Sequence, residues 1–219
     1  MITKQLSCVA NAFKELKSEY KAGVSCDIIR KRFLSSIKKQ LKECSFKYDF
    51  LLGVDTLNID GVSKGAILKE GDTLLIDISV KHNGVWCDVC RTFFVGEPTK
   101  FQRDTFSMIV RSIKAGEKVL KAGVKACDVY NAVNGVYQES GYSLIHHAGH
   151  KIGSRALLQP QFLMEKQGKV KCGEYFTIES GLYKNCGIRL ENDYLITENG
   201  ADNLFEGLLP LKIEEYILR

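Results

Sequence analysis

No stretch of this 219-residue chain approaches the roughly 18 to 20 consecutive apolar residues that a membrane-spanning helix requires. Residues 1–23 are charged throughout and lack the apolar core of a signal peptide. The net charge of +5 is spread along the chain rather than gathered into one basic block. These absences predict a cytoplasmic protein that binds neither a membrane nor nucleic acid.

The motifs of several enzyme classes are also missing. The sequence contains no nucleophile elbow of the Gly-x-Ser-x-Gly type, no phosphate-binding glycine loop and no His-Glu-x-x-His helix. Its eight cysteines would suit a disulfide scaffold only in a much shorter chain, so we expect mostly free thiols. Cys87 and Cys90 have the spacing of a redox pair, but they lie in an expected strand, which makes a redox role the minor alternative.

The length and the 45% hydrophobic content suffice for one sizeable core, and we expect a single domain over residues 1–219. Apolar residues at spacings of three and four predict a helix over about residues 4–20, and Ser25 can cap a second helix. The same order returns later in the chain. A helix is expected over about residues 101–121 and another over about residues 127–140, and the tetrapeptide Lys-Ala-Gly-Val precedes the second helix of each pair.

Each half then continues with a glycine-acid turn and a short apolar strand that ends in an acid. Asp77 ends the first of these strands and Glu179 ends the second. A further acid follows each of them, Asp88 eleven residues after Asp77 and Glu191 twelve residues after Glu179. The two halves are therefore expected to be structural copies that each contribute one pair of carboxylates.

Asn83-Gly84 lies between two segments in which apolar and polar residues alternate. This pattern predicts a tight hairpin with arms over residues 74–80 and 85–95, and hence antiparallel strands. Duplicated helix pairs packed on such strands predict an α+β fold with internal pseudo-twofold symmetry.

Four carboxylates drawn into one cleft would raise one another's pKa unless positive charge joined them. Two divalent cations would balance the four charges, and His150, which has glycines on both sides, adds an imidazole. This oxygen-rich donor set suits manganese, iron, cobalt or zinc. Two such ions about 3.5 to 4 Å apart activate water and polarise a carbonyl group, so hydrolysis is the expected chemistry.

The order of these residues, with the motifs Gly-His-Lys-Ile-Gly, Phe-Thr-Ile-Glu-Ser-Gly and Arg-Leu-Glu, resembles the pita-bread metallopeptidases. This family includes methionine aminopeptidases and Xaa-Pro peptidases. The likeness covers nearly the whole chain and is closer to the Xaa-Pro branch, although we expect the N-terminal domain of that branch to be lacking. The resemblance implies a pita-bread fold, in which duplicated helix pairs pack on a curved antiparallel sheet, and two bound metal ions. Manganese is the expected metal, with cobalt, zinc or iron as alternatives.

The resemblance also implies a role for each metal ligand. Asp88 and Glu191 would bridge the two ions, and Asp77 would chelate one of them. His150 and Glu179 would hold the other ion.

On the substrate side, Glu179 matches the acid that moves protons in this family, and His146 is expected to be catalytic and to contact substrate. Arg189 and Asp60 are the other expected substrate-binding residues. The family usually has histidines at the positions of Asp60 and Leu157, where they contact substrate and stabilise the tetrahedral intermediate. An ionised aspartate and a leucine donate no hydrogen bond, and losing such a donor typically costs about 10²-fold to 10³-fold in rate.

Three functions are consistent with these residues. The first is a dinuclear metal-dependent aminopeptidase or Xaa-Pro peptidase-like hydrolase acting at the N-termini of short peptides. The second is a metal-binding but catalytically impaired module that binds a peptide or protein, because Asp60 and Leu157 replace the expected imidazoles. The third is creatinase-like action on a small molecule. The sequence leaves a homodimer as an open alternative.

Overall fold

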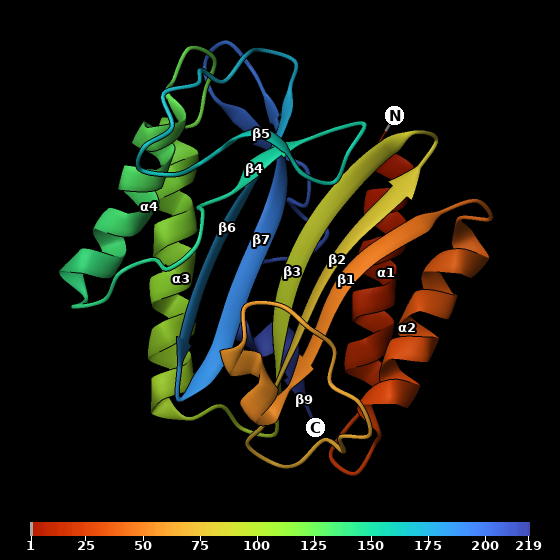
Figure 1. Ribbon diagram of the computed structural model, residues 1–219. Coiled ribbons are helices and arrows are strands. Elements are labelled where there is room, and N and C mark those ends of the chain that lie inside the picture. The colour runs from red at the N-terminus through yellow and green to blue at the C-terminus, as the bar shows by residue number, and fades with distance from the viewer. Residues whose placement is uncertain (1) are drawn as a thin grey trace.

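The computed structural model describes residues 2–219, and in it two helix pairs pack on one curved, mostly antiparallel sheet (Figure 1). The strands follow the order β1-β2-β3-β7-β6-β4-β5 across the sheet, with β8 beside β7 and β9 beside β3. No helix in this described part of the chain combines the length and the apolarity needed to cross a membrane. The elements are α1 (Thr3–Glu19), α2 (Cys26–Gln40), β1 (Ser45–Leu52), the 3-10 helix η1 (Gly53–Leu57), β2 (Thr73–His82), β3 (Val85–Val95), α3 (Lys100–Val119), α4 (Ala126–Glu139), β4 (His150–Ile152), β5 (Leu158–Gln161), β6 (Tyr175–Lys184), β7 (Cys186–Ile196), β8 (Ala201–Asn203), the 3-10 helix η2 (Ile213–Tyr216) and β9 (Ile217–Leu218).

All four helices lie where the sequence predicts them, with slightly shifted ends. Ser25 caps α2 as expected, because its hydroxyl accepts a hydrogen bond from the backbone N–H of Asp27. Helix α3 begins with a capping box, in which Thr99 and Gln102 satisfy each other's backbone N–H groups. The predicted hairpin is also confirmed, since β2 and β3 meet at Asn83 and Gly84, and both turn residues have positive φ.

The internal duplication is visible in the backbone hydrogen bonds. In each half, one backbone hydrogen bond closes the turn after the first helix of the pair. A second backbone hydrogen bond closes the turn before the first acid-bearing strand. In the first half they are Gly23 N to Leu68 O and Gly71 N to Val95 O, and in the second half Gly123 N to Val170 O and Gly173 N to Ile196 O. The two halves therefore repeat their tertiary contacts as well as their order of elements.

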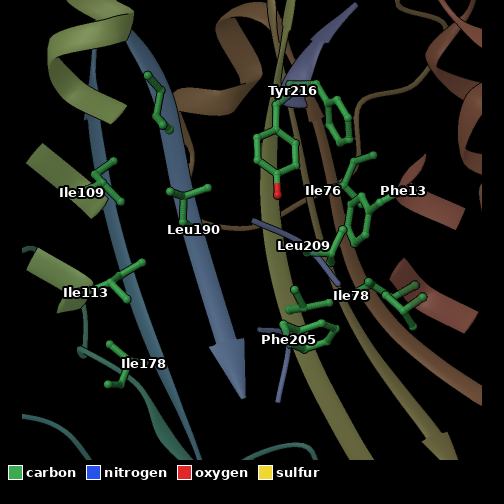
Figure 2. Packing of buried hydrophobic residues seen from close by; sticks show 14 of the residues in the cluster. Phe13, Ile76, Ile78, Ile109, Ile113, Ile178, Leu190, Phe205, Leu209 and Tyr216 are labelled. Carbon is green, nitrogen blue, oxygen red and sulfur yellow. The ribbon is translucent and has the colours of Figure 1, made fainter. Parts of the chain in front are cut away.

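Alternating strand residues give the sheet one face covered by helices and one open face. Ile76 and Ile78 of β2 point into the core beside Phe13 of α1 (Figure 2). The other half of the core includes a matching layer from α3, β6 and β7, namely Ile109, Ile113, Ile178 and Leu190 (Figure 2). Because neighbouring strand residues face opposite ways, Asp77 points to the open face.

Arg91 of β3 is fully buried and has no carboxylate partner within 4 Å among the described residues. All five of its N–H groups nevertheless have acceptors, and they tie the C-terminal segment to the middle of the sheet. The acceptors are the Tyr216 hydroxyl at 2.9 Å, the carbonyl oxygens of Cys90 at 2.8 Å, Glu191 at 2.6 Å and Leu209 at 3.0 Å, and Asn192 Oδ1 at 2.5 Å.

Replacing Arg91 by methionine should lower the free energy of unfolding by at least about 3 kcal/mol, because it leaves several buried acceptors without donors. The measurement is urea denaturation followed by circular dichroism. Arg111→Met, at an exposed position on α3, is the control and should change the value by less than about 0.5 kcal/mol. Equal losses in the two variants would show that the Arg91 hydrogen bonds do not stabilise the fold.

Candidate active site

Strand register places several acids in one row on the open face of the sheet. Across β1, β2, β3, β7 and β6, each member of the row lies directly opposite the next: Asp49, Asp77, Cys90, Glu191 and Glu179. A second row, displaced by two residues along the strands, contains Lys47, Ser79 and Asp88. Because residues two apart on a strand share a face, both rows point the same way.

His150 reaches these rows because the backbone before it lies unusually close to β6. A Cβ on Gly149 would lie 2.1 Å from the carbonyl oxygen of Thr177, and its φ is +128°, so only glycine is compatible with this position. The N–H of His150 donates to Thr177 Oγ1 at 3.1 Å, and the N–H of Glu179 donates to the Ala148 carbonyl oxygen at 3.2 Å. The glycine beside the histidine therefore has the close-approach role that the sequence suggested.

All five residues expected to bind metal line one open pocket of about 510 Å³. They are Asp77, Asp88, His150, Glu179 and Glu191. The residues expected on the substrate side, His146, Arg189 and Asp60, line the same pocket. The structure thus brings together every residue that the sequence singled out, while the role of each one stays a prediction.

The donor atoms of these residues fit divalent cations. His150 Nε2 lies 3.8 Å from Asp88 Oδ2 and 3.9 Å from Glu191 Oε1. Asp88 Oδ1 and Glu191 Oε1 are buried without a hydrogen-bond partner, which is costly for carboxylate oxygens unless another positive group binds them. Two groups of closely spaced ligand atoms share Glu191: one adds Asp88 and His150, and the other adds Asp77 and Glu179.

Burial makes negative charge unfavourable in this cluster. It raises the pKa of Asp77 to about 7, although the Arg189 guanidinium opposes this effect. It raises the pKa values of Asp88 and Glu191 well above the ordinary range, and the neighbouring carboxylates raise them further. The pKa of His150 is lowered to about 4, mainly by burial, so its imidazole is neutral and able to bind a metal near neutral pH.

Glu179 has a different environment from the other acids. Burial alone would raise its pKa, but His147 and His146 outweigh burial and hold the pKa well below its ordinary value. His146 Nδ1 lies 2.9 Å and His147 Nδ1 lies 3.3 Å from Glu179 Oε1. The sequence analysis did not single out His147, although its position beside His146 in the His-rich segment could have signalled it.

Asp193 is a second residue that the sequence analysis missed. It is fully buried on β7, and its Oδ2 accepts a hydrogen bond from the backbone N–H of Asp88 at 3.0 Å. The other carboxylate oxygen, Oδ1, is buried without a partner. Asp193 therefore fixes the backbone at one expected ligand and adds another acid beside the cluster.

Arg189 on β7 lies deep in the pocket wall, with only 3% of its surface exposed. Nη2 lies 2.9 Å from Asp77 Oδ2 and 3.2 Å from Asp49 Oδ2. Nη1 donates to the Ile59 carbonyl oxygen at 2.7 Å and to the Tyr183 hydroxyl at 3.2 Å, and Nε donates to Cys90 Sγ at 3.4 Å. The guanidinium therefore makes four hydrogen bonds to protein groups and an ion pair with Asp77.

The pocket rim has apolar side chains where an imidazole was expected. Leu157 is 45% exposed, and Ile59, which precedes the exposed Asp60, is 42% exposed. Ile59 belongs to the segment that follows η1, and this segment crosses in front of the sheet (Figure 1). Hydrogen-bond donors for a substrate must therefore come from elsewhere in the pocket.

A curved sheet with duplicated helix pairs and an acidic, imidazole-containing pocket on its open face defines a pita-bread protein, as the sequence predicted. The chain belongs to metallopeptidase family M24, which it matches over residues 1–198. Members of this family use divalent metals. The free thiols expected from the sequence are also observed, because all eight cysteines are unpaired.

The chain is similar to an Xaa-Pro dipeptidase of Pyrococcus furiosus, with 28% identity over 205 residues that cover 82% of this chain and 59% of that protein. Among solved structures, it is similar to a prolidase from Pyrococcus furiosus, with a TM-score of 0.84, 25% identity, and coverage of 92% of this chain and 62% of that one. An Xaa-Pro dipeptidase from Bacillus anthracis shares the fold, with a TM-score of 0.92 and 24% identity over 99% of this chain and 62% of that one. The chain thus spans about three fifths of the length of these relatives.

Manganese should stabilise the protein, because an ion that binds only the folded state adds about 2.7 kcal/mol at one hundred times its dissociation constant. Thermal unfolding with and without Mn²⁺ measures this effect. Asp88→Asn should lose most of the stabilisation, yet without metal it should be at least as stable as the wild type, because it removes a carboxyl group whose ionised form is disfavoured by burial. His82→Ala, outside the pocket, is the control, and an equal Mn²⁺ response in all three proteins would disprove a metal site at Asp88.

Metal affinity should fall as the pH is lowered through about 7. A carboxyl group whose pKa is raised carries a proton below that pKa, and Asp77, at about 7, must lose this proton to bind an ion. His150 does not contribute to this step, because its lowered pKa keeps it neutral above about pH 4. Calorimetric titration with Mn²⁺ at pH 6 and pH 8 tests the expectation, which a constant dissociation constant would contradict.

Proposed function

We propose that this protein is a dinuclear metal-dependent exopeptidase that cleaves short peptides at their N-termini, with Xaa-Pro peptides as the preferred substrates. The observation that carries the proposal is the convergence of the four expected carboxylate ligands and His150 in a single open pocket, where Asp88 Oδ1 and Glu191 Oε1 have no hydrogen-bond partner. The names of the similar Xaa-Pro dipeptidases support the choice of substrate.

The residues that would hold the two ions are Asp77, Asp88, His150, Glu179 and Glu191. When bound, two divalent ions supply Lewis acidity and lower the pKa of water. Manganese is the proposed metal, because a set of carboxylates with one imidazole is a hard donor set.

Glu179 is the proposed proton acceptor. Its lowered pKa keeps it ionised, and the Nδ1 atoms of His146 and His147 lie close to the same carboxylate oxygen. A carboxylate held in this way can take a proton from water as water attacks the peptide carbonyl, and can pass that proton to the leaving amine. His146 therefore orients Glu179 and keeps it charged, and a direct contact of His146 with substrate is the further role proposed for it.

The substrate-side residues have unequal access to a ligand. Asp60 is exposed at the rim, where it can accept a hydrogen bond from an amino group. Arg189 holds Asp77 and Asp49, so we assign it a positioning role in place of the substrate contact expected from the sequence. Apolar Ile59 and Leu157 offer contact surface to an aliphatic or prolyl side chain.

A metal-binding module without efficient catalysis is the second candidate, because Asp60 and Leu157 supply no hydrogen-bond donor to a tetrahedral intermediate. His147 partly offsets this loss, since it places a further imidazole in the pocket. Creatinase-like action on a small molecule is the third candidate, and substrate profiling separates it from peptidase action.

The manganese-loaded protein should hydrolyse Xaa-Pro dipeptides such as Ala-Pro faster than matched peptides without proline. Glu179→Gln should lower kcat by about 10²-fold or more, because it removes the proton acceptor. Release of free amino acid, followed by chromatography, measures both effects, and His82→Ala should behave as the wild type. Confirmed metal binding without turnover of any peptide would favour the binding module instead.

A further inference from the structure

A peptide substrate with a free C-terminus brings a carboxylate into this pocket, and only two lining residues have a permanent positive charge, Arg189 and Lys47. Arg189 is committed to protein groups, because its charge is paired with Asp77 and Asp49, and its guanidinium also donates to the Ile59 carbonyl, the Tyr183 hydroxyl and Cys90. It is also almost completely buried. Lys47 is therefore the cation that remains for a substrate carboxylate.

Lys47 is exposed on β1 and forms no ion pair with a carboxylate within 4 Å in the part of the chain that the structure describes. Its Nζ lies over the indole of Trp86, 5.9 Å from the ring centroid. Such a cation–π contact restricts the long side chain while leaving the ammonium donors unused. The ammonium is thus held at the edge of the pocket without a competing internal carboxylate.

The position of Lys47 along the sheet suits a short ligand. Lys47 lies opposite Ser79, and Ser79 lies opposite Asp88, so two strand spacings of roughly 4.8 Å each separate the backbones of Lys47 and Asp88. The four-carbon stem of lysine covers part of this span. A single residue after the scissile bond, about 3.8 Å long between Cα atoms, covers much of the remainder.

We propose that Lys47 is a specificity-determining residue that binds the free C-terminal carboxylate of the substrate, so that the site favours dipeptides over longer or C-terminally blocked peptides. This role rests on the proposed peptidase function and assigns a residue to bind the C-terminal carboxylate of the substrate. It also gives Lys47 a role different from that of Lys81, whose Nζ lies at the same 5.9 Å from the Trp86 ring but which does not line the pocket.

The experiment compares Ala-Pro with Ala-Pro amide, which lacks the terminal negative charge. The wild type should favour the free acid, and Lys47→Gln should raise KM for Ala-Pro by about 5- to 10-fold with little change in kcat, as expected when a charge-assisted hydrogen bond is lost. KM for the amide should stay the same. Lys47→Arg should retain the preference for the acid, and Lys81→Gln, the matched control, should retain it fully.

A direct binding measurement keeps this test separate from the test of peptidase activity. L-Proline and L-prolinamide are titrated into the manganese-loaded protein and followed by calorimetry, which needs no turnover. Weaker binding of proline alone to Lys47→Gln supports the role of Lys47 even if no peptide is cleaved. An unchanged ratio of proline to prolinamide affinity in Lys47→Gln, or an equal change in Lys81→Gln, would overturn the proposal.

Discussion

Burial of negative charge is the constraint on which the rest of this structure depends. Asp77, Asp88, Glu191 and Asp193 lie close together on the open face of the sheet, and burial raises the pKa of each of them. Arg189 offsets part of this charge at Asp77, but Asp88 Oδ1 and Glu191 Oε1 are still buried without partners. A fold that holds carboxylates in this way is incomplete without added positive charge, which is why a divalent metal is the simplest explanation of the site.

The sheet brings these acids together by register rather than by proximity in the sequence. Each half of the duplicated chain places a pair of acids at strand positions that face away from the helices, and antiparallel pairing aligns these positions in two neighbouring rows across the sheet. A register shift of one residue in any of these strands would turn the acid on that strand toward the helix-covered core. The apolar residues Ile76, Ile78, Ile178 and Leu190 therefore do more than fill the core, because their burial fixes the direction in which the acids point.

Local patterns predicted the elements that short-range forces define. Helical spacing, the Ser25 cap, the Asn83-Gly84 turn and the repeated glycine-acid strands are all visible in the sequence and predict an α+β fold with internal pseudo-twofold symmetry, whereas the pita-bread architecture was implied by the family resemblance. The order of acids around one histidine also predicted which residues converge in the pocket. The contacts of Arg189 could not be predicted from the sequence, because its partner Asp49 lies 140 residues away and only the tertiary structure brings the two together. Asp193 was missed for the same reason, because its partner Asp88 lies 105 residues away, whereas the position of His147 beside His146 could have signalled it.

Two buried arginines of the sheet are bound to other protein groups, whereas Lys47 at the pocket edge has no carboxylate partner among the described residues. Arg91 and Arg189 are both buried and bonded to protein groups, Arg91 holding the C-terminal segment to the sheet and Arg189 holding Asp77 and Asp49. Rigid guanidinium groups suit such tasks, because their donors have fixed directions. A ligand that enters the pocket meets the flexible ammonium of Lys47 and the carboxylate of Asp60 instead. Opposite charges at the rim, together with apolar Ile59 and Leu157 between the ligand and solvent, are a suitable environment for a small zwitterion that carries an aliphatic side chain.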